Sequence, residues 1–308
     1  MVASKIAPVL TRFAPSPSGL LHVGNAYAAT IANRASRDAE NGRFLLRIED
    51  IDIGRCRPEF ETAIVEDLAW LGLQWEEPVR RQTDHMDDYA AALAQLEGAE
   101  LLYRCFCTRA QIKAEIDGAD RAPHGLEGPV YPGTCRHVSQ AESDARRAAG
   151  APFALRLHME AAMKRVGPLT WHDQTRGTIT ARPDQFGDAV VARKDVPTSY
   201  HLSVTVDDHL QGVTLVTRGV DLFEATHLHR LLQALLTFEP PRYAHHPLLV
   251  SRDGQRFAKR NHAATLRAMR NAGVNADDLH AALASDESER LHTLIVVAEG
   301  ATDTNHRP

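Results

Sequence analysis

The stretch between residues 12 and 25 places the tightest constraint on how this chain folds. It reads R-F-A-P-S-P-S-G-L-L-H-V-G-N and follows an apolar segment that begins at Val9. Pro15 and Pro17 break regular structure and fix a tight loop, and the pattern predicts a helix over residues 26–39. A helix N-terminus offers unpaired N–H groups and a partial positive charge, so this order of strand, loop and helix favours a phosphate-binding site.

The residues at the end of this stretch supply chemistry that suits a phosphate. Gly24 lets a flat ligand approach the backbone, and His22 can donate a hydrogen bond to a phosphate oxygen. The motif His-x-Gly-Asn, which ends at Asn25, is short and by itself also describes a capped surface turn. Its interpretation therefore depends on the residues around it.

The longer pattern R-F-A-P-S-P-S-G-x-L-H-x-G resembles the nucleotide-binding signature of class I glutamyl-tRNA synthetases. The resemblance implies an α/β fold: a Rossmann-like catalytic domain on a parallel sheet, a zinc-containing insertion and a short helical C-terminal end. It implies catalytic roles for His22 and Lys259, and nucleotide binding by these two residues together with Gly24 and Asn25. The glutamate pocket that it implies consists of Arg12, Phe13, Ala14, Pro15, Ser16, Glu49, Tyr200 and Arg218.

Charged residues stand at the ends of two predicted strands. Glu49 and Asp50 close the run R-F-L-L-R-I-E-D, and ligands of parallel sheets bind beyond the carboxyl ends of the strands. An ordinary strand-end acidic pair is the alternative; the resemblance implies that Glu49 holds the ammonium group of glutamate.

Arg218 ends V-T-L-V-T-R-G, where it can hold a carboxylate through two hydrogen bonds. On the residues alone, Arg218 is equally a surface ion pair and Tyr200 a core residue.

Three cysteines gather around one segment and suggest a structural metal site. Cys105 and Cys107 form a C-x-C pair, and Cys135 follows a loop rich in glycine and proline. Thiol-rich sites favour four-coordinate zinc, and three buried or free cysteines are the alternative. On the residues alone, His137 is the expected fourth ligand. C-x-C followed by Y-x-G-x-C resembles the zinc site of a short relative of the glutamyl-tRNA synthetases, which implies Tyr131 instead.

A basic segment at residues 251–260, S-R-D-G-Q-R-F-A-K-R, falls where the family carries its mobile Lys-x-Ser-Lys-type loop over the ATP phosphates. Arg256 replaces the first lysine, Ala258 replaces the serine, and Arg260 ends the motif. Lys259 remains, and we expect it to stabilise the phosphates at the transition state.

Length, composition and net charge limit the kinds of protein that this chain can be. With 308 residues, 44% apolar and 24% charged, the chain is long enough for one large domain or two. No apolar run approaches a membrane-spanning length, so we expect no membrane partner and a cytoplasmic location. We also expect a monomer. A net charge of −5 means that a tRNA partner needs a local basic face. The candidates for that face are Arg34, Arg37, Arg136, Arg146, Arg147 and residues 252–260.

We expect four segments along the chain: the first half of the catalytic domain (1–100), an insertion that binds zinc and contacts the acceptor (101–185), the second half with the Lys259 loop (186–262), and a short helical region with a mobile tail from Asp286 (263–308). Hydrophobic periodicity predicts helices over 59–71, 84–96 and 222–236 (capped by Asp221), and one helix or two over 262–283. It predicts short strands over 153–159, 169–182 and 188–195.

The cysteine pattern and the chain length together look most like the glutamyl-Q tRNA(Asp) synthetases. That family activates glutamate with ATP, which magnesium accompanies, without needing tRNA. It then transfers glutamate to queuosine at the wobble position of tRNA-Asp. Two alternatives stay open: a truncated glutamyl-tRNA synthetase that charges a tRNA 3′ end, and a catalytically silent paralogue that binds a nucleotide or tRNA as a regulator. The altered loop around Lys259 is the only support for the second.

Overall fold

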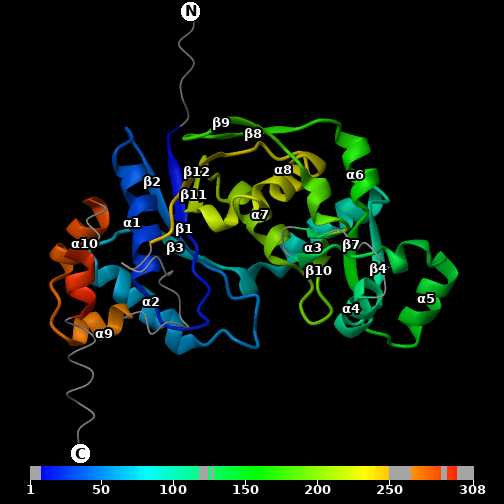
Figure 1. Ribbon diagram of the computed structural model, residues 1–308, viewed down its shortest axis with the longest axis horizontal. Helices are drawn as coiled ribbons and strands as arrows, with labels where there is room; N and C mark the ends of the chain where they lie inside the picture. The colour runs from blue at the N-terminus through cyan, green and yellow to red at the C-terminus, as the bar shows by residue number, and fades with distance from the viewer. Residues whose placement is uncertain (1–7, 118–123, 126–127, 250–264, 286–289, 297–308) are drawn as a thin grey trace, which may run out of the picture. The chain divides into compact units, whose positions relative to one another are not determined.

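The computed structural model describes residues 8–117, 124–125, 128–249, 265–285 and 290–296 (Figure 1). The chain divides into two compact units. The first unit contains residues 1–84, 213–221 and 241–308, and the second contains residues 85–212 and 222–240. Each unit is therefore built from segments that lie far apart in the sequence, and each is described by itself.

Parallel strands form the centre of the first unit. Strands β1 (Leu10–Phe13), β2 (Arg43–Ile48) and β3 (Glu76–Arg81) pair in parallel in that order. Strands β11 (Leu215–Gly219) and β12 (Arg242–His246) also pair in parallel. Nearly every residue of β1 and β2 is buried, as expected of a parallel sheet covered on both faces. The predicted α/β fold with a parallel sheet is confirmed.

Strand β11 starts beside β1, although two hundred residues of sequence separate them. The Leu10 N–H donates to the hydroxyl oxygen of Thr214 (2.9 Å), and the Thr214 N–H donates to the Leu10 carbonyl (3.0 Å). The carboxyl ends of β1 and β11 therefore lie near each other. Arg12 and Arg218, predicted to belong to one site, stand on these two strands.

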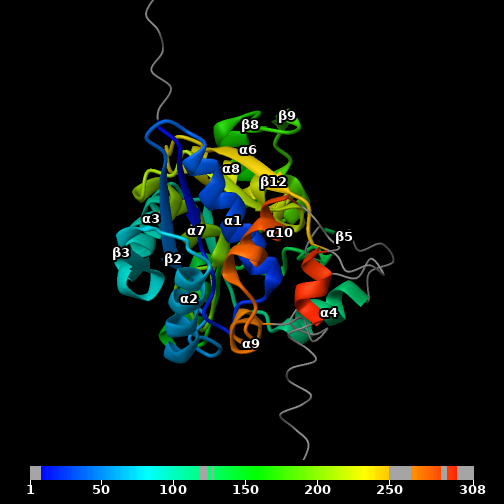
Figure 2. The ribbon, with the colours of Figure 1, turned by 90° about the vertical axis from the view of Figure 1, so that its left-hand side faces the viewer.

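The helices of the first unit include α1 (Val23–Arg37), which packs against the sheet, and α2 (Pro58–Trp70), α9 (Leu266–Asn271) and α10 (Ala276–Ser285); α9 contacts α2, and α10 contacts α1. Helices α1 and α10 lie side by side in both views (Figures 1 and 2). Their contacts belong to a core that includes Val23, Ile48, Ile64, Leu68 and Leu279, none of which is exposed. Between α1 and β2 the chain turns at Gly42, where a Cβ atom would lie 1.9 Å from the Ser36 carbonyl oxygen.

The prediction of a mobile tail from residue 286 is wrong in part. Residues 290–296 are helical, and Leu291 and Ile295 are only 2% and 3% exposed in the core of the first unit. The segment over 262–283, predicted to be one helix or two, contains two helices, α9 and α10, because Gly273 adopts a left-handed conformation (φ +76°) between them.

The second unit contains an antiparallel sheet of β4 (Leu102–Cys105), β7 (Ala154–Leu157) and β10 (Val190–Ala192), in the order β10-β7-β4. It also contains the hairpin of β8 (Thr170–Asp173) and β9 (Gly177–Thr180), and the two-residue strands β5 (His124–Gly125) and β6 (Gly128–Pro129). Its helices are α3 (Met86–Gly98), α4 (Arg109–Asp117), α5 (Gln140–Ala148), α6 (Met159–Val166), α7 (Tyr200–Leu210) and α8 (Ala225–Leu235).

Several predicted boundaries in this unit need correction. Helix α8 begins at Ala225, and Asp221 lies in a separate 3₁₀ turn (Val220–Leu222), so Asp221 does not cap the helix. Helix α3 starts after a 3₁₀ turn at Gln82–His85 rather than at residue 84. The strand predicted over 188–195 is limited to β10, where a register shift interrupts its pairing with β7.

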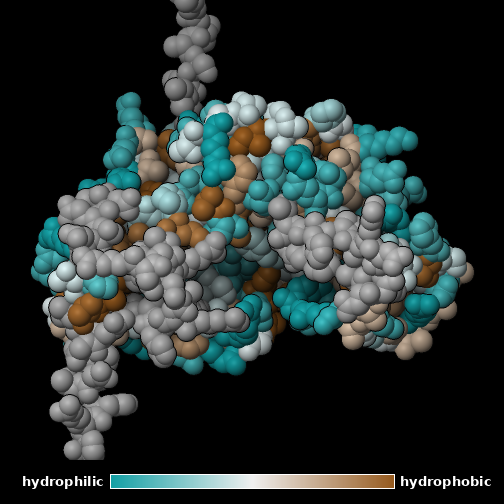
Figure 3. Space-filling view, viewed as in Figure 1, coloured by the Kyte–Doolittle hydropathy of each residue, from teal (hydrophilic) through white to brown (hydrophobic). Residues whose placement is uncertain are grey.

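No helix in the described part of the chain is long and apolar enough to cross a membrane. On the face shown in Figure 3, apolar side chains appear as small separate patches among hydrophilic ones.

Helix α2 buries a carboxylate in the first unit. The Asp67 side chain is fully buried, neither carboxylate oxygen has a hydrogen-bond partner, and the Arg270 guanidinium lies 3.6 Å away. Burial raises the pKa of Asp67 from 3.8 to about 6, although Arg270 opposes this shift. Between these two pH values the folded chain binds a proton that the unfolded chain releases. The stability that Asp67 contributes is therefore fully present below about pH 4 and is lost as the pH rises through about 6.

We predict that Asp67→Asn, which stays neutral, raises the free energy of unfolding at pH 8 by about 2 kcal/mol and has little effect at pH 4. Urea unfolding of both proteins across this pH range measures the difference. Glu66→Gln is the matched control, because Glu66 also pairs with Arg270 (3.1 Å) but is exposed. An equal pH dependence in wild type and Asp67→Asn would contradict the prediction.

Candidate active site and metal centre

The connection between β1 and α1 carries most of the predicted site residues. It follows Phe13 and is held against the chain beyond β2 by two backbone hydrogen bonds. The Glu49 N–H donates to the Pro15 carbonyl (3.0 Å), and the Arg57 N–H donates to the Pro17 carbonyl (3.0 Å). The predicted glutamate-pocket residues at 14–16 therefore lie directly beside Glu49.

Helix α1 begins at Val23, so its predicted start at residue 26 is wrong. His22 is the N-cap: its Nδ1 accepts a hydrogen bond from the Gly24 N–H (3.1 Å), and its N–H donates to Oδ1 of Asn25 (3.1 Å). This reciprocal pair satisfies amide groups that would otherwise be unpaired, and so extends the helix toward the loop. Because Nδ1 is an acceptor, the neutral imidazole carries its hydrogen on Nε2 and can donate from that side.

A second set of contacts holds the start of α1, next to His22. The Leu266 N–H donates to the Leu21 carbonyl (2.9 Å), and His22 forms an isolated antiparallel bridge with Thr265. The start of α9 is thus attached to the start of α1. Lys259 lies outside the described residues, and its predicted position over the phosphates stays a prediction.

The two acidic residues after β2 have different surroundings. Oε1 of Glu49 accepts a hydrogen bond from the guanidinium of Arg47 (3.2 Å), which is fully buried. Oδ1 of Asp50 accepts the Thr83 N–H (2.9 Å), and Oδ2 contacts the Thr83 hydroxyl. Asp50 therefore holds the chain that follows β3, whereas Glu49 remains the better candidate for a substrate ammonium group.

Arg12 and Arg218 are both buried, with only 6% of each residue exposed. Arg12 donates to the Thr217 carbonyl (3.2 Å), and Nε of Arg218 donates to Nε2 of His245 (3.2 Å) on the neighbouring strand. The Arg218 guanidinium also lies over the Tyr243 ring, 5.4 Å from its centre. These contacts hold both cations at the carboxyl end of the sheet. The interpretation of Arg218 as a surface ion pair is wrong.

Tyr200 belongs to the second unit. It is the first residue of α7, half-buried, and its ring meets the rings of His201 and His229 edge-on at 5.4 and 5.7 Å. Its membership of the glutamate pocket stays a prediction.

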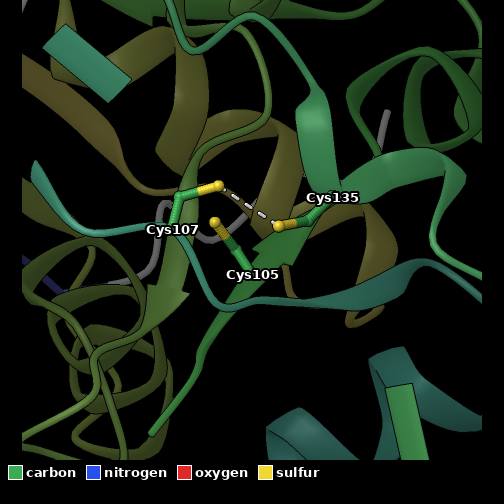
Figure 4. A group of neighbouring side chains, drawn as sticks. All are labelled: Cys105, Cys107 and Cys135. Atoms are coloured by element: carbon green, nitrogen blue, oxygen red, sulfur yellow. Dashed lines mark hydrogen bonds between the residues drawn. The ribbon is translucent and has the colours of Figure 1, made fainter. Parts of the chain in front are cut away.

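The three predicted thiol ligands converge in the second unit (Figure 4). Cys105, Cys107 and Cys135 have their sulfur atoms within 4.8 Å of one another, and Sγ of Cys107 lies 3.3 Å from Sγ of Cys135. The Tyr131 hydroxyl oxygen lies 3.4 Å from Sγ of Cys105 and 3.7 Å from Sγ of Cys107, and accepts the Cys135 N–H (2.8 Å). This cluster could hold a metal ion.

Electrostatics distinguish the members of the cluster. Burial raises the pKa of Tyr131, and hydrogen bonding to Cys105 raises it further. Burial also raises the pKa of Cys107 to about 11. Burial opposes ionisation of Cys135 as well, but hydrogen bonds from Tyr131 and Cys107 outweigh it and lower the pKa of that thiol. Of Cys107 and Cys135, Cys135 is therefore the thiol that ionises more readily.

His137, the fourth ligand expected from the residues alone, lies in the 3₁₀ turn Thr134–His137. Within the described part of the chain, the group of His, Cys and carboxylate ligand atoms near this point contains only the three thiols. The structure thus brings Tyr131 to the thiols and leaves His137 outside the group.

Residues 8–285 match the family model described as tRNA synthetases class I (E and Q), catalytic domain. The chain belongs to this family of class I tRNA synthetases. It is accordingly an enzyme of the aminoacyl-tRNA synthetase type, a ligase, and the predicted catalytic-domain fold is confirmed.

Similar proteins agree with this assignment. The Glutamyl-Q tRNA(Asp) synthetase of Rhodobacter capsulatus is 44% identical over 277 residues, covering 88% of this chain and 98% of that protein. The Glutamate–tRNA ligase of Aquifex aeolicus is 37% identical over 274 residues, covering 89% of this chain and 56% of that protein. The crystal structure of a glutamate tRNA ligase from Elizabethkingia meningosepticum in complex with its amino acid has a TM-score of 0.70 and 27% identity, covering 82% of this chain and 52% of that one.

The sequence did not predict the side chains that contact and position the predicted site residues. His245 and Tyr243 contact Arg218, and Arg47 contacts Glu49. Arg47 could have been suspected, because a charged residue inside an apolar strand run needs a partner. No sequence pattern around His245 indicates its contact with Arg218, since that contact follows from the pairing of β11 with β12.

One candidate for the tRNA-binding face pairs with a carboxylate of its own unit. Arg136 donates from Nε and Nη2 to Oδ2 of the buried Asp188 (2.8 and 2.7 Å), and its place on such a face stays a prediction. Arg146 pairs with Glu142 on α5.

We predict that Asn25→Ala lowers the free energy of unfolding by about 1 kcal/mol, because it removes the acceptor of the His22 N–H at the start of α1. Asn25→Asp is the matched control, since its carboxylate accepts the same hydrogen bond and adds a favourable charge at a helix N-terminus. Urea unfolding measures both variants. Equal stabilities of Asn25→Ala and Asn25→Asp would contradict the role of this cap.

Proposed function

We propose that this protein activates glutamate with ATP to form glutamyl-adenylate and transfers glutamate to queuosine at the wobble position of tRNA-Asp. The observation that carries the proposal is the match with the Rhodobacter capsulatus protein, which extends over 98% of that protein at 44% identity. The buried cations and Glu49 around the β1–α1 connection support the activation step. Glutamate, ATP with magnesium, and tRNA-Asp are the partners that the proposal requires.

Activation needs positioning and charge stabilisation rather than a strong base. A carboxylate oxygen of glutamate attacks the α-phosphorus of ATP, the bond to the β-phosphate oxygen breaks, and pyrophosphate leaves. Arg12 and Arg218 suit the carboxylates of glutamate, and Glu49 suits its ammonium group. The Nε2–H of His22 can donate to a phosphate oxygen, and Lys259 is proposed to stabilise the same charge.

Transfer then uses the adenylate as an activated acyl group. A hydroxyl oxygen on the queuosine ring attacks the acyl carbon and forms an ester bond. The bond between the acyl carbon and the phosphate oxygen then breaks, and AMP leaves. The hydroxyl proton passes to solvent or to the departing phosphate.

We propose one structural zinc held by Cys105, Cys107, Tyr131 and Cys135. A tetrahedral zinc with bonds of about 2.3 Å to sulfur and about 2.0 Å to oxygen has sulfur–oxygen edges of about 3.5 Å. The distances from the Tyr131 oxygen to the sulfurs of Cys105 and Cys107, 3.4 and 3.7 Å, fit such a set. The sulfurs of Cys107 and Cys135, 3.3 Å apart, would separate toward the sulfur–sulfur edge of about 3.8 Å when the ion binds. The cation would favour the ionised forms of ligands whose pKa values burial raises. Its role is to join the C-x-C segment to the chain around Cys135.

The test of the proposed function is glutamate-dependent ATP–pyrophosphate exchange without tRNA, followed by transfer of labelled glutamate to tRNA-Asp. We expect exchange with glutamate but not with glutamine or aspartate. We also expect transfer to queuosine-containing tRNA-Asp and none to the same tRNA without queuosine.

Other outcomes would assign another function. Exchange only in the presence of tRNA, with glutamate attached to the 3′ end, would identify a glutamyl-tRNA synthetase. Bound ATP without exchange under either condition would identify a silent nucleotide-binding protein. Nuclease digestion of the labelled tRNA, followed by identification of the fragment that carries glutamate, separates the two attachment points.

We predict about one zinc per chain in protein purified without chelator, measured by elemental analysis. Cys135→Ala should lose this zinc and unfold at a lower temperature, because three remaining ligands bind the ion less tightly. Cys56→Ala is the matched control, since Cys56 lies in the first unit and should leave the zinc content unchanged. Comparison of Tyr131→Phe with His137→Ala identifies the fourth ligand. Wild-type protein without stoichiometric zinc would contradict the proposed centre.

A further inference from the structure

Two imidazole rings meet inside the second unit, where α7 packs against α8 (Figure 1). Nδ1 of His201 on α7 lies 3.0 Å from Nε2 of His229 on α8, which is a hydrogen-bond distance between ring nitrogens. One of these nitrogens must carry the hydrogen and the other must accept it. The bond holds the two rings in a defined arrangement, with their centres 5.2 Å apart and their planes inclined at 56°.

The surroundings of this histidine pair are mainly apolar. His229 is 3% exposed, and Leu202 and Leu228, which adjoin the histidines in sequence, are fully buried in an apolar core. The ring of Phe186 meets the His201 ring edge-on at 5.9 Å. Burial of ring nitrogens is unfavourable unless they are hydrogen-bonded, and two apolar side chains would join α7 to α8 without that cost. The pair therefore indicates a role other than helix packing.

Both imidazoles contact the ring of Tyr200, the first residue of α7. The Tyr200 ring meets the His201 ring at 5.4 Å and the His229 ring at 5.7 Å, with interplanar angles of 63° and 64°. Aromatic rings prefer such tilted contacts at this separation. The Ser203 hydroxyl donates to the Tyr200 carbonyl (3.3 Å) and holds the backbone at the start of the helix. The direction of the phenol group thus depends on side chains from two helices.

We propose that His201 and His229 are positioning residues for Tyr200, whose ring their hydrogen bond holds in the orientation that binds glutamate. This inference rests on the proposed function, with Tyr200 in the predicted glutamate pocket. The histidines act on the substrate through the tyrosine. Without the bond between the imidazoles, the tyrosine ring would populate other orientations. Affinity for glutamate would then fall by the same factor as the competent fraction.

The affinity for glutamate tests this proposal, measured by calorimetric titration without ATP and as the KM in ATP–pyrophosphate exchange. His229→Leu, which cannot form the hydrogen bond, should raise the Kd and the KM for glutamate about tenfold, as expected when about one molecule in ten has the competent orientation. The KM for ATP should stay within about twofold of wild type. His229→Gln should restore the affinity, because a carboxamide can donate or accept at the position of Nε2.

His209→Leu is the matched control for these variants. His209 also belongs to α7, but it is exposed and its ring stacks on Phe238, with 3.8 Å between the ring centres. Its replacement should leave the affinity for glutamate unchanged. His201→Leu, at a half-buried position, decides the question if His229→Leu does not fold, and His201→Asn is its conservative counterpart.

A double-mutant cycle separates positioning from a general structural effect. Tyr200→Phe keeps the ring but removes the hydroxyl, and should weaken glutamate binding by itself. In the Tyr200→Phe background, His229→Leu should change the affinity by less than about twofold, because the group through which the histidine acts is already absent. Losses that multiply independently would contradict the proposal.

Unchanged affinity for glutamate in the leucine variants of the pair, or in Tyr200→Phe, would overturn the proposal. An equal loss in His209→Leu, or a loss that the carboxamide variants do not restore, would overturn it as well. Wild-type protein that binds glutamate but gives no exchange would refute the proposed function and leave the binding comparison standing. Normal exchange by wild type together with wild-type affinity in the variants would refute this inference alone.

Discussion

The reciprocal hydrogen bonds between His22 and Asn25 determine where α1 starts, and the candidate active site depends on that point. With the helix start fixed at Val23, the loop after Phe13 has a set length and meets the backbone near Glu49 and Arg57. The same cap fixes the His22 ring, because its Nδ1 is engaged by the helix itself. A helix that began at residue 26 would leave this imidazole on a free loop. Local capping chemistry therefore decides the geometry of the predicted phosphate site.

Buried cations give the first unit its electrostatic character. Arg12, Arg47 and Arg218 are each less than 7% exposed, and burial of a guanidinium is unfavourable unless hydrogen bonds and opposite charges compensate for lost hydration. Glu49 accepts a hydrogen bond from Arg47, the Thr217 carbonyl accepts one from Arg12, and the His245 ring accepts one from Arg218. These hydrogen bonds fix the direction of each guanidinium. A guanidinium held in a fixed direction is suited to a carboxylate, as the proposed glutamate substrate requires.

Sequence reasoning succeeded where the signal was local. The apolar runs of β1, β2 and β11, the break at Pro15 and Pro17, and the C-x-C pair each indicate structure within a few residues, and the parallel sheet and the thiol cluster follow from them. It failed where contacts join distant segments. The register that puts His245 opposite Arg218 is set by strand pairing, and Thr83 reaches Asp50 only because β2 and β3 are neighbours. The burial of Leu291 depends on a core assembled from the whole first unit.

The two units hold different kinds of polar cluster. The first unit holds buried cations around the β1–α1 connection. The second unit holds the thiol cluster, whose members lie on either side of α4 in the sequence: Cys105 and Cys107 precede the helix, and Cys135 follows it. Ile112 of α4 packs against this cluster. The contacts among the three cysteines therefore join the two ends of the segment that contains α4, and the helix packs where those ends meet.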